Sequence, residues 1–116
     1  MKLRLFLTAV LLAVLVVSGC AQQTPAGDVF SISDTAKSGC ISLCRDALSK
    51  DRDLSNGPCL SDGNAGWDVN DWVCDVAHSP RQAVDNDPAN QCMEFRKGMA
   101  HHFVEVDPDC NFIKAV

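Results

Sequence analysis

The sequence predicts a small α+β domain held together by disulfides, with two helices and about three antiparallel strands. Three observations lead to this prediction. Residues 35–50 carry apolar side chains at helical spacing. Residues 72–78 and 101–107 alternate between apolar and polar side chains, as strands do. Six cysteines follow residue 34, and they supply the cross-links that a core of this small size needs.

The first helix is predicted at residues 35–50, with Ser33 and Asp34 as candidate N-caps. Cys40 and Cys44 lie one helical turn apart, so both face the core but neither reaches the other without distorting the helix. The rest of the pairing stays open at this point. The apolar face of the helix comprises Ala36, Cys40, Leu43, Cys44, Ala47 and Leu48, and the six cysteines expected in disulfides are Cys40, Cys44, Cys59, Cys74, Cys92 and Cys110.

A long loop and a strand follow this helix. Residues 51–70 are rich in Gly, Pro, Asp, Asn and Ser and are expected to be irregular, with Cys59 fastening them to the core. Residues 72–78 read WVCDVAH, and their alternation predicts a strand. The core face of this strand is expected to carry Trp72, Cys74, Val76 and His78.

The C-terminal part of the chain predicts a second helix and a hairpin. Residues 87–97 begin with an Asp-Pro pair typical of a helix start, and Cys92 and Phe95 are expected on the inner face of this helix. Residues 101–107 and 111–116 are predicted to be the two strands of the hairpin.

Residues 1–19 have the composition of an export signal. Two basic residues, Lys2 and Arg4, precede thirteen uncharged residues at 5–17. This apolar run is shorter than the roughly 17–25 residues that a membrane-spanning helix needs. A cleaved signal peptide is therefore expected rather than a permanent membrane span.

The signal ends in Val-Ser-Gly-Cys at residues 17–20, which resembles the lipobox of bacterial-type lipoproteins. We predict cleavage before Cys20 and attachment of a diacylglycerol to its thiol. Two acyl chains give stable membrane attachment, whereas one chain holds only marginally. Residues 20–33 are then expected to form the lipid anchor and a flexible tether, and residues 34–116 the folded domain.

The charge of the chain excludes some partners. Removal of residues 1–19 leaves eight Lys and Arg against fifteen Asp and Glu, a net charge of -7. Such a field repels phosphate backbones and anionic lipid headgroups, so nucleic-acid binding is not expected. The expected partners are the membrane, through the lipid anchor, and a protein or small ligand.

Three histidines and two acids are the candidate metal ligands: His78, His101, His102, Asp75 and Glu105. Strand alternation would send His101 and His102 to opposite faces, so at most one of them could share a site with His78. Local hydrogen bonding is the favoured interpretation of all three. We therefore predict no metal site and no cofactor.

Other sites of known chemistry match poorly. The chain has no Cys-x-x-Cys pair, which counts against a zinc ribbon and against a thioredoxin-like redox centre. Residues 51–62 and 107–112 begin like EF-hand loops but lack glycine at the sixth position, which favours ordinary Asx turns. No hydrolase motif surrounds any Ser or His, so the protein is not expected to be an enzyme.

Four blocks of the sequence resemble those of small, uncharacterised, cysteine-rich lipoproteins of prokaryotes, archaea among them. The blocks are NGPCLS at 56–61, DWVCDVAHSPRQAVDN at 71–86, NQC at 90–92 and AHHFVEVDPDCN at 100–111. The resemblance covers nearly all of the predicted domain. It implies lipid anchoring but no activity and no site residues.

The leading functional hypothesis is a non-enzymatic extracytoplasmic module, anchored at the membrane, that binds a protein or small ligand through its acidic loops. One alternative is a metal-binding lipoprotein that uses His and Asp or Glu ligands. Another is a small hydrolase, which would need a cleft joining His78 or His102 to an acid and a hydroxyl.

Overall fold

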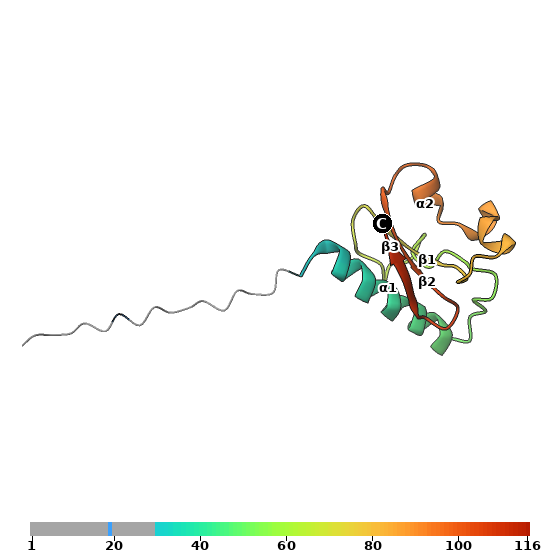
Figure 1. The fold of residues 1–116 in the computed structure, drawn as a ribbon, viewed down its shortest axis with the longest axis horizontal. Coiled ribbons are helices and arrows are strands. Elements are labelled where there is room, and N and C mark those ends of the chain that lie inside the picture. The colour runs from blue at the N-terminus through green and yellow to red at the C-terminus, as the bar shows by residue number, and fades with distance from the viewer. Residues whose placement is uncertain (1–18, 20–29) are drawn as a thin grey trace, which may run out of the picture.

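The computed structural model describes residue 19 and residues 30–116. The predicted signal peptide apart from its last residue, the predicted lipidation site Cys20 and most of the predicted tether lie outside these residues. Figure 1 shows one long helix, α1, packed along a small sheet, with the short helix α2 on the other side of the sheet. Of the helices that the structure describes, none is both long enough and apolar enough to span a membrane.

Helix α1 spans Ile32–Ser49 and begins three residues earlier than predicted. Its N-cap is Ser31, and neither Ser33 nor Asp34 has that role. The Ser31 Oγ accepts a hydrogen bond from the Asp34 backbone N–H at 3.1 Å and donates one to the Asp34 carboxylate at 2.7 Å. The predicted apolar face is buried except for Leu48, which is 40% exposed in the last turn.

The sheet has three strands in the order β1-β2-β3, namely Trp72–Val76, His102–Val106 and Phe112–Ala115. Strands β2 and β3 form the predicted antiparallel hairpin. Strands β1 and β2, however, are parallel, so the prediction of an all-antiparallel sheet is wrong. Two parallel strands begin at the same end of a sheet. After β1 the chain therefore crosses back to the end where β1 began, and only then enters β2.

The crossover between β1 and β2 covers the second face of the sheet. It contains two short 3₁₀ helices, η1 at Ala83–Asn86 and η2 at Pro88–Asn90, and then α2 at Met93–Arg96. The single helix predicted at 87–97 is thus broken in two, because Gln91 and Cys92 are extended. Asp87 does cap the first piece by accepting from the Ala89 N–H at 2.9 Å.

Three disulfides join these elements, as the number of cysteines predicted. Two of them fasten α1 to the sheet and to the β2–β3 turn, and the third fastens the loop after α1 to the crossover. The pairs are Cys40–Cys74, Cys44–Cys110 and Cys59–Cys92. Disulfides form and persist in oxidising compartments, which indicates that the domain folds outside the cytoplasm.

Strand β1 is largely buried on both of its faces and along its outer edge. Cys74, Val76 and Val104 pack against α1 in the main core, whereas Val73 packs under the crossover. Residues 58–60 of the long loop run beside β1 and exchange backbone hydrogen bonds with it, Leu60 N–H to Cys74 O and Val76 N–H to Pro58 O. The alternation of residues 72–78 predicted a single core face for this strand, but β1 is also buried on its other face, at Val73.

Candidate functional site

A pocket of about 520 Å³ lies on the sheet face opposite α1. Its floor is built by Val73 and Asp75 of β1, Phe103 and Glu105 of β2, and Lys114 of β3. Because strand side chains alternate between faces, these positions share one face. We call it the carboxyl pocket, after Asp75 and Glu105.

The crossover supplies the walls of the carboxyl pocket. The Phe95 ring meets the Phe103 ring edge to face, with centroids 5.1 Å apart. The Lys114 ammonium lies 5.3 Å from the centroid of the Phe103 ring, within cation–π range. The pocket thus combines aromatic surface with several charged groups. The crossover residues that line it are Arg81, Gln91, Cys92, Phe95 and Arg96.

Asp75 and Glu105 are direct partners in the parallel register of β1 and β2. Burial, followed by the neighbouring negative charge of Glu105, raises the pKa of Asp75 to about 8, against a smaller opposing effect of Arg81. Glu105 is 7% exposed and binds the guanidinium of Arg81 at 3.0 Å, with the Lys114 ammonium 3.9 Å away. At neutral pH the Asp75 carboxyl group is therefore mainly protonated.

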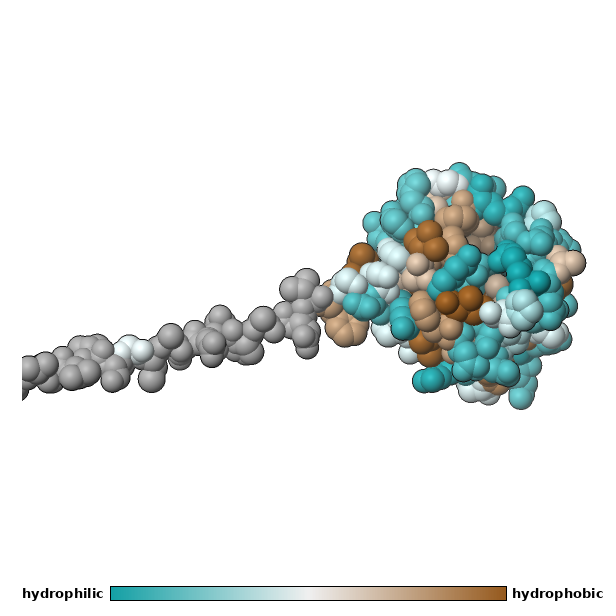
Figure 2. Space-filling model, in the orientation of Figure 1, coloured by the Kyte–Doolittle hydropathy of each residue, from teal (hydrophilic) through white to brown (hydrophobic). Residues whose placement is uncertain are grey.

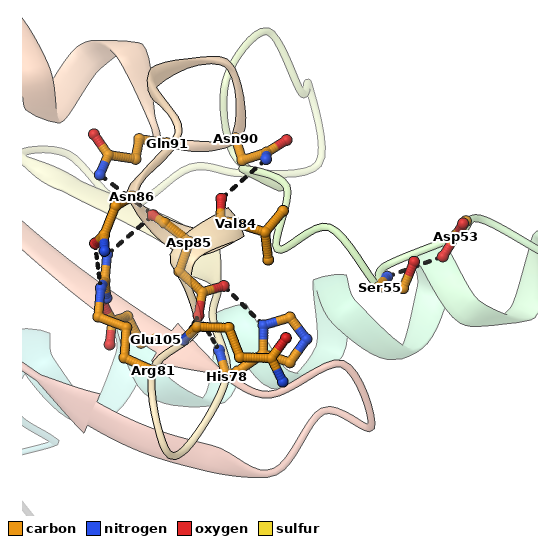
Figure 3. A network of polar contacts seen from close by, with 11 residues as sticks. Asp53, Ser55, His78, Arg81, Val84, Asp85, Asn86, Asn90, Gln91 and Glu105 are labelled. Atoms are coloured by element: carbon orange, nitrogen blue, oxygen red, sulfur yellow. Dashed lines mark hydrogen bonds and ion pairs between the residues drawn. The ribbon is translucent and has the colours of Figure 1, made fainter.

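Arg81 connects this carboxyl pair to a second polar cluster (Figure 3). Its Nη1 donates to Glu105, its Nε to the Asn86 side chain at 2.8 Å, and its Nη2 to the Asp85 carbonyl at 3.1 Å. A guanidinium held by three acceptors loses little further entropy when it meets a ligand. Arg81 is the only Lys or Arg between residues 53 and 95.

The second cluster is built around Asp85, which is 2% exposed. Its carboxylate accepts from the His78 ring at 2.8 Å, from the His78 N–H at 3.0 Å and from the Gln82 N–H at 2.8 Å (Figure 3). Burial raises the pKa of Asp85, but these three hydrogen bonds outweigh it, so the pKa lies below its ordinary value. The cluster fixes the His78 ring in one orientation.

Gly57 closes the site of Asp85 from the other side. It has a φ of +68°, and a Cβ built there would lie 2.6 Å from the Asp85 Oδ1 and 2.8 Å from the Val76 carbonyl oxygen. A glycine is therefore needed at this position both for the backbone conformation and for the space that the carboxylate occupies.

The three histidines do not come together. His78 follows the end of β1, while His102 pairs with Trp72 at its start, roughly 13 Å back along the strand. His101 precedes β2, so the alternation argument does not apply to it. His101 and His102 both meet the carboxylate of Asp71, at 2.6 Å and 3.8 Å. The five predicted metal candidates therefore fall into separate places: Asp75 and Glu105 are neighbours on the sheet, His101 and His102 meet at Asp71, and His78 lies apart from both pairs.

Among the described residues, one group of three potential metal ligands lies within 4.8 Å of one another: Cys59, Asp62 and Cys92. The two sulfur atoms are joined in a disulfide, which removes the thiolates that a metal would need. Asp62 accepts from the Met93 N–H at 2.6 Å through Oδ2, and its Oδ1 is buried without a hydrogen-bond partner.

The aspartates of the two EF-hand-like segments serve their own turns. Asp53 accepts from the Ser55 N–H at 2.9 Å. Asp107 accepts from the backbone N–H groups of Asp109 and Asn111, at 2.9 and 2.8 Å. These are the local contacts expected of Asx turns. In the described part of the chain, no Ser or Thr hydroxyl is hydrogen-bonded to a histidine ring.

Comparison with known proteins adds no assignment: no protein-family model, curated protein or solved structure matches this chain. The carboxyl pocket and the Asp85 cluster are therefore the features of this chain that bear on its function.

Replacement of Gly57 by alanine is expected to destabilise the domain by about 3–5 kcal/mol. The positive φ costs roughly 1–2 kcal/mol, and displacement of Asp85 weakens hydrogen bonds to a buried charge. Gly63→Ala is the matched control, since Gly63 has a φ of +62° and no atom within 4 Å of its added Cβ. Urea unfolding of both variants measures the difference, and equal losses would contradict the packing role of Gly57.

Replacement of Asp75 by asparagine is expected to remove a pH dependence of stability. Between pH 5 and 7 the unfolded chain has lost the Asp75 proton, whereas the folded domain retains it. The free energy of unfolding of the wild type should thus fall as the pH rises, by up to about 1.4 kcal/mol per pH unit from this group. Asp75→Asn should be more stable than the wild type at pH 7 and similar at pH 4. If the free energy of unfolding changed with pH in the same way in the wild type and in Asp75→Asn, the raised pKa of Asp75 would be excluded.

Proposed function

We propose that this chain is a lipid-anchored, extracytoplasmic binding module without enzymatic activity, and that the carboxyl pocket is its ligand site. One observation carries the proposal: the pocket brings three cationic side chains and a protonated Asp75 around aromatic surface. Its volume falls within the range of roughly 300–1,000 Å³ that is usual for small-molecule sites.

The charge of the pocket favours an anionic ligand. Arg81, Arg96 and Lys114 bring three positive charges, while Glu105 contributes one negative charge and Asp75 is neutral at pH 7. The chain that remains after the predicted cleavage is strongly acidic, so the pocket contrasts with the rest of the molecule. A small molecule with a carboxylate, sulfonate or phosphate beside an apolar ring fits this arrangement. The pocket has more support as a binding site than the acidic loops.

The proposed location combines two kinds of support. The three disulfides favour an oxidising compartment, and residues 1–20 have the pattern of a lipoprotein signal. The face of the domain in Figure 2 is mostly hydrophilic, with separate hydrophobic patches. Attachment through acyl chains on Cys20 would make a membrane-binding surface on this face unnecessary.

The two alternatives have less support. A metal site of His and Asp or Glu would need several of the five candidate ligands to converge, and His78 lies at the opposite end of β1 from His101 and His102. A hydrolase would need a hydroxyl beside the oriented His78, and the hydrogen bonds of the described residues include none.

Replacement of Cys20 by serine is expected to release the protein from the membrane, because serine cannot form the thioether to diacylglycerol. Fractionation of expressing cells, with a carbonate wash and an immunoblot, measures the distribution. Retention of the Cys20→Ser protein in washed membranes would contradict the lipid anchor.

The sulfonated aromatic probe 1-anilinonaphthalene-8-sulfonate should bind the native domain in the carboxyl pocket. Fluorescence titration at pH 7 should show that Arg96→Gln weakens binding about fivefold, as expected for loss of about 1 kcal/mol from one charged contact. Arg45→Gln makes the same change of charge on the exposed surface of α1 and should leave binding within twofold. An equal effect of the two variants would refute the pocket as the anion site.

A further inference from the structure

The Cys59–Cys92 disulfide differs from the other two in its exposure. All four cysteines of the other two disulfides are buried. Cys92 is also buried, at 3% exposed, but Cys59 is only half-buried, in the loop segment that runs beside β1. Of the six disulfide cysteines, Cys59 is therefore the one that solvent reaches most easily.

Polar groups that can donate a proton to a leaving sulfur lie near Cys92, the buried cysteine of this disulfide. The Cys92 Sγ lies 3.8 Å from the Asp75 Oδ1. The Ser61 Oγ lies 3.5 Å from the Cys59 Sγ and 3.8 Å from the Cys92 Sγ. This oxygen already accepts from the Cys74 N–H, so its own proton can point to a sulfur. Cys92 and Asp75 both line the carboxyl pocket, so water that enters the pocket can contact the Asp75 carboxyl group.

We propose that Cys59–Cys92 is a redox-active disulfide that exchanges with a small external dithiol, and that Asp75 donates the proton to the departing Cys92 sulfur. This stoichiometric exchange is not an enzymatic turnover, and it goes beyond ligand binding in the carboxyl pocket. It does not require that the pocket bind an anion.

The exchange has two steps. A thiolate of the dithiol attacks the Cys59 Sγ, so a bond forms between these sulfurs and the Cys59–Cys92 bond breaks. Cys92 leaves as a thiolate and takes the proton of the Asp75 carboxyl group. The second thiol of the reagent then loses its proton to water and attacks the reagent sulfur bound to Cys59. Cys59 leaves as a thiolate and is protonated by water. The dithiol is oxidised by two electrons to a disulfide, and Cys59 and Cys92 are reduced.

The charges around Asp75 keep its proton available at neutral pH. Burial and the charge of Glu105 on β2 are the main causes of its raised pKa, and Asp85 on η1 adds to them. Arg81 opposes them but is shared with Glu105 and the Asp85 carbonyl. The other charged groups lining this pocket are Arg96 of α2 and Lys114 of β3, and on the sulfur side a carboxylate oxygen of Asp62 lies within 4.8 Å of both sulfur atoms.

Limited reduction of the native protein tests the site of exchange. Dithiothreitol is the probe, free thiols are trapped with N-ethylmaleimide, and mass spectrometry of peptides follows each disulfide. Cys59–Cys92 should be reduced at least ten times faster than Cys40–Cys74 and Cys44–Cys110. Equal rates for the three disulfides, or faster reduction of either buried one, would overturn the proposal.

The pH dependence of this reduction tests the role of Asp75. The rate, divided by the fraction of dithiothreitol present as thiolate, should fall in the wild type as the pH rises through about 8, where Asp75 loses its proton. Asp75→Asn should be about tenfold or more slower at pH 7, with a flat profile. Asp62→Asn also removes a carboxylate near the sulfurs, but it should keep the wild-type fall. An unchanged rate and profile in Asp75→Asn would overturn the role of Asp75.

Discussion

The parallel pairing of β1 with β2 is the constraint on which the rest of the structure depends. It sets Asp75 beside Glu105, so two carboxyl groups face each other across neighbouring strands of a covered sheet. The second charge is unfavourable in this place, and Asp75 keeps its proton at neutral pH. The same pairing requires a crossover, and that crossover brings Arg81 and Cys92 over the carboxyl pair. Topology, charge and sulfur chemistry at this place thus share one cause.

The disulfides complement this sheet in different ways. All three join residues 33 to 66 positions apart and so restrict the unfolded ensemble, but Cys40–Cys74 and Cys44–Cys110 also fasten α1 to the layer beneath it. The third disulfide, Cys59–Cys92, joins two segments with little regular structure. Its opening would leave the main core between α1 and the sheet intact. A domain can therefore use one disulfide chemically while the other two preserve the fold.

Sequence patterns predicted the helix face, the three strands and the disulfides, because periodicity and cysteine count report local geometry and compartment. These patterns did not predict the direction of β1 relative to β2, because side chains alternate in the same way in parallel and antiparallel pairs. The prediction of one helix at 87–97 was wrong because contacts with distant parts of the chain interrupt it. Cys92 is bonded to Cys59, and the Met93 N–H donates to Asp62. Asp75 and Glu105 were recognised as acids, but as metal ligands. Arg81 was missed, although it is an isolated cation in an acidic stretch.

Strand β3 forms one edge of the sheet, whereas the outer edge of β1 is covered by residues 58–60. An edge strand offers backbone groups that another chain can pair with. Lys114 lies near the middle of β3 and turns its ammonium toward Glu105. If a second copy of β3 paired with this edge in antiparallel direction, the Lys114 ammonium groups of the two copies would come close together. Their repulsion disfavours extension of the sheet between molecules. The lysine that helps to hold the pocket therefore also limits self-association at the edge of the sheet.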